Sequence, residues 1–178
     1  KYLCIKEVSV DYSFPKNLKI AVYGRKLLIQ LMPFTNGVDF HNFESSPSSE
    51  AALLDWNFPE VSSGEAFIAD DNGYVFSKKG EDSFLPTLFL NENVSLGRQL
   101  DSANFNSIDK IITKYQELGL FSNLSDFKAK KVDNSLQVNS VPKVVFSLEK
   151  DVLRQLASLQ LIVQKAKINE RIPEIIDL

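Results

Sequence analysis

The residues with the strongest chemical reactivity are single copies in this chain. The 178-residue sequence has one histidine, His41, and one cysteine, Cys4. A histidine acting as a general base needs an oriented partner, and a catalytic thiolate needs a neighbouring base. The sequence identifies neither partner. We therefore interpret His41 as a solvated loop residue and Cys4 as a small buried apolar residue at the start of a strand. These two residues also cannot form a zinc site of the usual kind, so we predict no metal site.

The run Asp70-Asp71-Asn72-Gly73 has the acidic character of a calcium-binding loop. Its glycine follows the first aspartate too closely, and no distal glutamate completes the pattern. An Asn-Gly pair between extended segments is instead a strong hairpin signal. We predict that residues 65–69 and 74–77 pair around this turn. The sequence has no glycine-rich phosphate loop and no nucleophile elbow, so it implies no cofactor.

Composition excludes several classes of partner. The net charge is -3 and the chain has no basic stripe, which argues against nucleic acid or an acidic membrane surface. A hydrophobic content of 44% supports an ordinary core. No run approaches the roughly 20 apolar residues of a membrane span, and no signal peptide is visible. The chain starts at Lys1 and stops on a strand pattern, so we expect it to be a fragment of a longer protein.

The first half of the chain reads mainly as strands. Residues 5–12 and 18–23 alternate polar and apolar side chains around a Phe-Pro turn, which predicts an antiparallel hairpin. Residues 25–31 continue extended and are long enough to leave one sheet and enter another. Residues 33–64 have no strong period and contain His41 and the only tryptophan, Trp56. We interpret this segment as a mobile or loosely packed loop.

A short strand and a helix follow. Residues 85–90 form an extended run whose Pro86 suits a sheet edge or a strand start. Ser107 is predicted to cap a helix that ends at Gly119. One face of this helix carries apolar side chains, which are Ile108, Ile111, Ile112, Tyr115 and Leu118.

The last third of the chain predicts a meander, a long helix and a final strand. Residues 127–132, 135–140 and 144–146 are the three strands, and Ser147 stands where the helix cap is expected. Apolar side chains then recur at the spacing of one helix face: Val152, Leu156, Leu159, Val163 and Ala166, with Leu153 and Ile162 beside them. Pro173 ends this helix, and residues 174–178 turn extended. The predicted class is α+β, with a mostly antiparallel sheet backed by two main helices.

A chain without a catalytic constellation is expected to work through its surfaces. A strand at a sheet edge exposes N–H and C=O groups that a partner strand can use. The final strand is therefore the element of greatest functional interest.

Four stretches, in this order, resemble the extracytoplasmic region of the bacterial cell-division family FtsQ, called DivIB in Gram-positive bacteria. Residues 5–22 resemble the closing hairpin of the family's POTRA domain, including its Phe-Pro turn. Residues 67–76 resemble the hairpin that opens the family's β domain, and residues 85–88 are similar to the Leu-Pro-x-Leu motif that follows. The spacing of Leu153, Leu156 and Leu159, followed by residues 176–178, matches the last helix and strand.

The resemblance implies a domain organisation and a location. Residues 1–32 would be the C-terminal part of a POTRA-like domain, residues 33–64 a long loop or insertion, and residues 65–178 an FtsQ-type β domain truncated in its last strand. The whole protein would cross the plasma membrane once, before Lys1, with this region on the extracytoplasmic side.

The resemblance also implies a non-enzymatic scaffold of the divisome. It would bind FtsB-like and FtsL-like division proteins and act indirectly on the septal peptidoglycan synthase. In the family, the partner strand pairs with the final strand. The partner-binding residues expected here are Ile172, Glu174, Ile175, Ile176, Asp177 and Leu178.

Two other function classes stay open at this point. A POTRA-type chaperone or translocation module that handles β-rich clients would share the first hairpin, and tandem POTRA units in a full-length chain would favour it. An enzyme acting on cell-wall glycan or peptide would require a converging acid pair or a nucleophile. Such a site would have to bring Asp70, Asp71 and His41 together.

Overall fold

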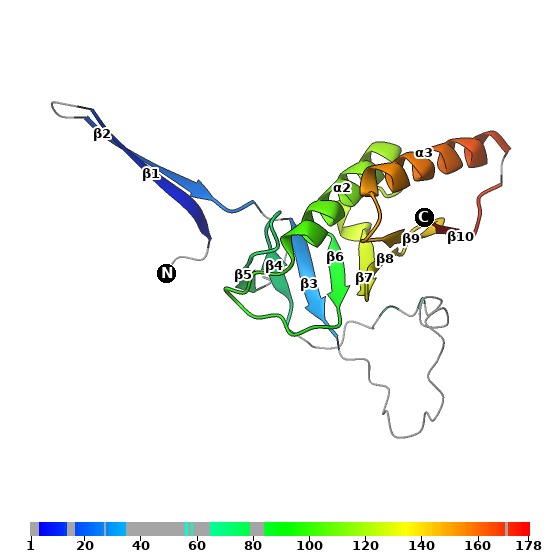
Figure 1. Ribbon diagram of the computed structural model, residues 1–178, viewed down its shortest axis with the longest axis horizontal. Helices are drawn as coiled ribbons and strands as arrows, with labels where there is room; N and C mark the ends of the chain where they lie inside the picture. Colours follow the sequence, from blue (N-terminus) through cyan, green and yellow to red (C-terminus); the bar gives the residue numbers. More distant parts are fainter. Residues whose placement is uncertain are drawn as a thin grey trace, which may run out of the picture.

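The part of the chain that the structure describes folds into one large sheet, two long helices and a separate hairpin (Figure 1). The computed structural model describes residues 4–13, 17–26, 28–34, 56, 58, 65–78, 84–169 and 171–178. Both long helices cover the same face of the sheet (Figure 1). This α+β arrangement confirms the predicted fold class.

The hairpin consists of β1 (Ile5–Ser13) and β2 (Asn17–Gly24), which pair antiparallel as predicted. One of its faces is formed by apolar cross-strand pairs, which are Val8–Val22, Val10–Ile20 and Tyr12–Leu18. Each of these six side chains is more than half exposed. The hairpin projects away from the large sheet (Figure 1). No other described residue therefore covers its apolar face.

The large sheet has eight strands. Their order across the sheet is β10 (Ile175–Asp177), β9 (Lys143–Ser147), β8 (Ser135–Val138), β7 (Lys128–Val132), β6 (Thr87–Leu90), β3 (Ile29–Pro33), β4 (Phe67–Ala69) and β5 (Val75–Lys78). The pairs β3–β6, β6–β7 and β9–β10 are parallel, and the other neighbours are antiparallel. Strand β3, except for its last residue Pro33, lies within the range 1–32 predicted for the POTRA-like unit, yet it pairs in this sheet.

Strand β6 lies at the centre of the sheet, between β7 and β3, so the prediction of an edge position is wrong. Pro86 is compatible with this position because it precedes the first strand residue, Thr87. Its carbonyl accepts a hydrogen bond from the Gln30 N–H at 2.8 Å. A proline at the start of a strand costs the ladder no donor, which is the other possibility that the sequence left open.

Helix α2 (Ser102–Leu118) starts earlier than predicted. The Asp101 carboxylate caps it by accepting the Ala103 N–H at 3.0 Å. Ser107 lies inside the helix and donates its hydroxyl to the Ala103 carbonyl, so its predicted role as a cap is wrong. Gly119 ends the helix as predicted, with a left-handed φ of 64° that favours glycine. A short 3-10 helix, Leu124–Asp126, precedes β7.

Helix α3 (Val152–Asn169) is capped by Asp151, which accepts the Leu153 N–H at 2.8 Å. The predicted cap, Ser147, is instead the last residue of β9. The predicted apolar stripe is buried in full: Val152, Leu156, Leu159, Val163 and Ala166. Leu153 is 63% exposed, so the stripe is narrower on that side than predicted.

The core lies between the two helices and one face of the sheet. Tyr115 of α2 is fully buried there, and its ring meets Phe127 and Phe146 edge to face. The opposite face of the sheet is contacted by Phe58, whose ring lies edge-on to Phe89 with 5.7 Å between centroids. Within the range 33–64, residues 33, 34, 56 and 58 are described. The predictions of a mobile loop and of a solvated His41 otherwise fall outside the described residues.

Candidate functional site

Strand β10 forms one end of the large sheet. It pairs in parallel with β9, with Ile176 opposite Val144. Within the part of the chain that the structure describes, no strand lies on its other side. The final strand is therefore an edge, a position that the sequence pattern could not establish.

The backbone groups of β10 divide between the two sides of the strand. The Glu174 carbonyl accepts the Lys143 N–H at 3.0 Å, and the Leu178 N–H donates to the Val145 carbonyl at 3.1 Å. Successive residues of an extended strand direct these groups to opposite sides, so those of Ile175 and Asp177 face away from β9. Unpaired edge groups of this kind are a template for another strand.

The other edge of the sheet, strand β5, is covered at its first residue. The Val75 N–H donates to the Arg98 carbonyl at 2.9 Å, and the Val75 carbonyl accepts the Gly97 N–H at 2.7 Å. Tyr74 also forms an isolated antiparallel bridge with Gln99. The loop around residues 97–99 thus occupies the outer side of β5 at the start of that strand.

The six residues predicted to bind a partner take different positions. Ile175 and Asp177 are exposed on the open strand, whereas Ile176 is buried in the core. Leu178 is half-buried directly after the strand. Ile172 and Glu174 are exposed but precede β10, because pairing begins at Ile175, after Pro173.

A side chain of α3 limits how far β9 and β10 pair. The Gln155 amide accepts the Ser147 N–H and donates to the Ser147 carbonyl, both at 2.8 Å. Ser147 is two residues after Val145, so its backbone faces the same side of β9 as the groups that bind β10. Gln155, itself buried, therefore takes the position of a neighbouring strand at the end of β9.

An apolar hollow lies beside the start of β10. Its volume is about 190 Å³. It is bounded by α3 and by the turn between β8 and β9, and its lining includes Val141, Pro142, Ile162, Ala166, Ile172 and Ile176. Sequence reasoning missed this feature, although an apolar pair in a turn, Val141-Pro142, is a signal that could have drawn attention to it.

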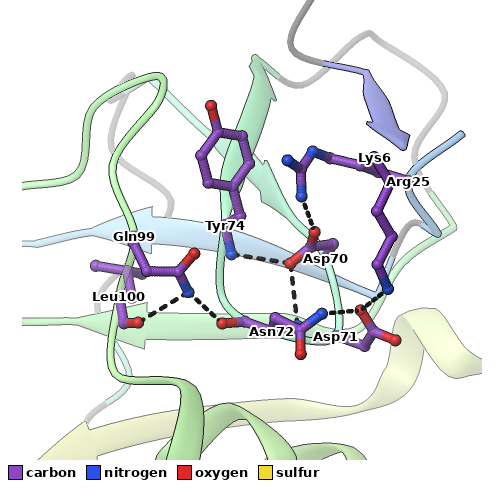
Figure 2. A network of polar contacts seen from close by, with 8 residues as sticks. All are labelled: Lys6, Arg25, Asp70, Asp71, Asn72, Tyr74, Gln99 and Leu100. Carbon is purple, nitrogen blue, oxygen red and sulfur yellow. Dashed lines mark hydrogen bonds and ion pairs between the residues drawn. The ribbon is translucent and has the colours of Figure 1, made fainter. Parts of the chain in front are cut away.

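Asp70 lies in a polar network rather than in a reactive cluster (Figure 2). Its fully buried carboxylate accepts the N–H groups of Asn72 at 3.0 Å and Tyr74 at 2.9 Å, and it contacts Arg25 at 2.5 Å. The Arg25 guanidinium also lies 3.8 Å from the centroid of the Tyr74 ring. These contacts hold the β4–β5 turn, which forms the predicted hairpin, against the chain that leaves β2.

The other candidate reactive residues do not join this network. Cys4 is exposed, so its predicted burial is wrong; it lies beside the hairpin rather than in the core. His41 falls outside the described residues. In the ranges that are described, no group of three or more His, Cys, Asp and Glu side chains is placed to hold a metal ion.

Comparison with known proteins provides no assignment. Neither a family model nor a curated protein matches the chain. In the described residues, no helix combines the length and the apolar character needed to cross a membrane.

Proposed function

We propose that this chain is a non-enzymatic docking module that binds a partner polypeptide by adding its strand to β10. The observation that carries the proposal is the outward direction of the Ile175 and Asp177 backbone groups, which follows from the hydrogen bonds on the inner side of the strand. The covered start of β5 supports β10 as the docking edge. The expected mode is β-augmentation, in which main-chain hydrogen bonds join the two proteins.

We further propose that the module belongs to a division scaffold of the FtsQ/DivIB type. Four ordered sequence motifs support this assignment, and a helix-backed sheet that ends in an open strand is compatible with it. On this proposal the partners are FtsB-like and FtsL-like proteins on the extracytoplasmic side of the plasma membrane. The module would act indirectly on septal peptidoglycan synthesis.

The test is binding of the full-length protein to the C-terminal segment of its cognate FtsB-like protein. Asp177→Pro removes one outward N–H and is tolerated in the fold, because proline is accepted at edge positions whose N–H faces solvent. We expect this variant to weaken binding about tenfold or more, and the control Asp177→Asn to bind like the wild type. Absence of binding, or equal binding by both variants, contradicts the proposal.

One observation favours a second function, a POTRA-type module that guides β-rich clients. The apolar face of the β1–β2 hairpin is exposed over three cross-strand pairs, and exposed apolar patches mark interaction sites. If this face holds clients, Ile20→Lys should abolish binding of an unfolded outer-membrane β-barrel protein, while Lys19→Ala on the other face should not. Equal binding of that probe by the two variants would exclude the hairpin face as a client site.

A further inference from the structure

We propose that the outer face of helix α3 is a docking site for an amphipathic helix of another protein, one whose apolar seam is flanked by acidic residues. Helix α3 lies at the margin of the molecule, with the sheet on one side (Figure 1). The face shares no residue with β10. The inference therefore goes beyond strand docking and does not depend on it.

Helix α3 carries a second line of apolar side chains in addition to its buried stripe. The members of this outer stripe are exposed, and they are Leu153, Ala157, Leu161 and Ile168. At about 100° per residue they fall within a sector of about 80°, on the far side of the helix from the buried stripe. Gln164 is the polar residue inside this sector. The outer stripe extends along about 22 Å of the helix.

The large side chains of the outer stripe are more exposed than a covered core would leave them. Leu153 is 63%, Leu161 is 67% and Ile168 is 81% exposed. The neighbouring helix α2 has no large apolar side chain among its exposed residues, which are Ser102, Ala103, Asn106, Lys110, Thr113, Gln116 and Glu117. A single exposed leucine needs no explanation, but aligned ones form a patch of the kind that marks an interaction site.

The charges of α3 indicate the chemistry of the partner. The helix contains three charged residues, and all are basic: Arg154, Lys165 and Lys167. On the helical projection Arg154 and Lys165 lie on one side of the outer stripe, and Lys167 lies on the other. No ion pair among the described residues involves either lysine. Acidic residues beside the seam of a partner helix would therefore meet a lysine on each side.

The same charges argue against a second copy of this chain as the occupant. In an antiparallel pair centred on the outer stripe, Arg154 of one copy would lie opposite Lys167 of the other. In a parallel pair each lysine would lie opposite its own counterpart. Both arrangements place like charges together, which is unfavourable at an interface.

The width of the outer stripe favours a helix over a membrane surface. A helix that buries one side in an apolar layer has an apolar stripe wider than about 100°, whereas the seam between two paired helices is narrower. The sector of about 80° fits the seam. Leu161 and Ile168 are also seven residues apart, which is the repeat of paired helices.

The test uses two synthetic helical peptides as probes, each about as long as the 18 residues of α3. Both carry leucine along one seam, and the positions beside the seam are glutamate in one peptide and lysine in the other. Binding to the isotopically labelled protein is measured by NMR titration. We expect the glutamate peptide to bind about tenfold or more tightly than the lysine peptide, with shift changes concentrated at the outer stripe.

Variants of the protein test the stripe and the charges separately. Leu161→Gln changes an exposed position, so the fold is retained, and it should weaken binding of the glutamate peptide about tenfold. The matched control Leu96→Gln makes the same change at an exposed leucine outside α3 and should bind like the wild type. The double variant Lys165→Glu with Lys167→Glu should reverse the preference, so that the lysine peptide binds more tightly.

Several outcomes overturn the inference. These are failure of both peptides to bind, unchanged binding by Leu161→Gln, and a preference that the double variant does not reverse. Sedimentation of the wild type as a dimer and of Leu161→Gln as a monomer would assign the face to a second copy. Binding of phosphatidylglycerol vesicles in place of the peptides would assign it to a membrane. Loss of peptide binding in Asp177→Pro would show that the site is not separate from β10.

Discussion

The Arg25 guanidinium lies 2.5 Å from the buried carboxylate of Asp70, although the two residues are 45 positions apart in the sequence. Arg25 follows the end of β2, and Asp70 follows β4. This ion pair therefore connects the chain leaving the hairpin to the large sheet. A second, more exposed contact of 3.8 Å between Lys6 and Asp71 lies beside it (Figure 2).

Removal of Asp70 should destabilise the protein. Asp70→Ala removes the ion pair with Arg25 and leaves the N–H groups of Asn72 and Tyr74 without their acceptor. We expect a loss of about 3 kcal/mol in the free energy of unfolding, measured with urea, since the variant breaks a buried ion pair and two hydrogen bonds at once. The matched control is Asp71→Ala, whose partner Lys6 is exposed; it should cost less than about 1 kcal/mol. Equal losses would mean that the buried carboxylate of Asp70 contributes no more to stability than the exposed one of Asp71.

The stripe of α3 provides a second prediction. Leu156→Asp places an unpaired charge in the core and should unfold the protein, with a loss of at least about 4 kcal/mol. Leu153→Asp introduces the same charge one turn earlier on the exposed side and should change stability by less than about 0.5 kcal/mol. Thermal melting by circular dichroism distinguishes the two. A wild-type melt for Leu156→Asp would show that the stripe does not pack on the sheet.

Stability should fall at high pH because of Tyr115. Burial raises the pKa of its hydroxyl, and the Ser140 side chain opposes only part of this shift. Above about pH 10 the unfolded chain loses the tyrosine proton while the folded protein keeps it, so the unfolded state is favoured. The expected loss is up to about 1.4 kcal/mol for each further pH unit.

Tyr115→Phe isolates this contribution. The variant should match the wild type within about 1 kcal/mol at pH 7 and lose less stability between pH 10 and 11. Urea unfolding at several pH values measures both. Parallel pH profiles for the two proteins would assign the alkaline loss to other groups.

Gln155 is expected to hold the end of β9. Gln155→Ala leaves the Ser147 N–H and carbonyl without their side-chain partner and should cost about 2 kcal/mol. The Ser147 amide should also exchange its hydrogen faster, because a partner that protects it is gone. Arg154→Ala, on the exposed side of α3, is the control and should leave both measurements unchanged. Unaltered exchange at Ser147 in Gln155→Ala would contradict the assigned role.

Local signals in the sequence predicted most of the elements. Alternation of side chains predicted the first hairpin, and the Asn-Gly turn predicted the second. Apolar spacing predicted the buried faces of α2 and α3, since these features all depend on neighbouring residues. Features that depend on contacts between residues far apart in the sequence could not be predicted. Pro86 precedes a central strand, and Asp70 is buried because Arg25 meets it, neither of which a local pattern reveals.

The candidate site divides in the same way. The sequence predicted a strand after Pro173 and nominated its residues, but the edge position of β10 depends on where seven other strands lie. The helix caps were also predicted from local sequence and were misplaced. Serines at 107 and 147 were plausible caps, but Asp101 and Asp151 cap the helices, because the true helix starts are fixed by packing on the sheet.

Ile176 belongs to the edge strand β10 and also to the buried cluster beneath α3. Binding of a partner strand to β10 and the folding stability of the protein are thus thermodynamically linked. A ligand that binds β10 only in the folded protein, at a free concentration about one hundred times its dissociation constant, adds about 2.7 kcal/mol to the unfolding free energy. A rise in melting temperature is therefore enough to detect a bound strand.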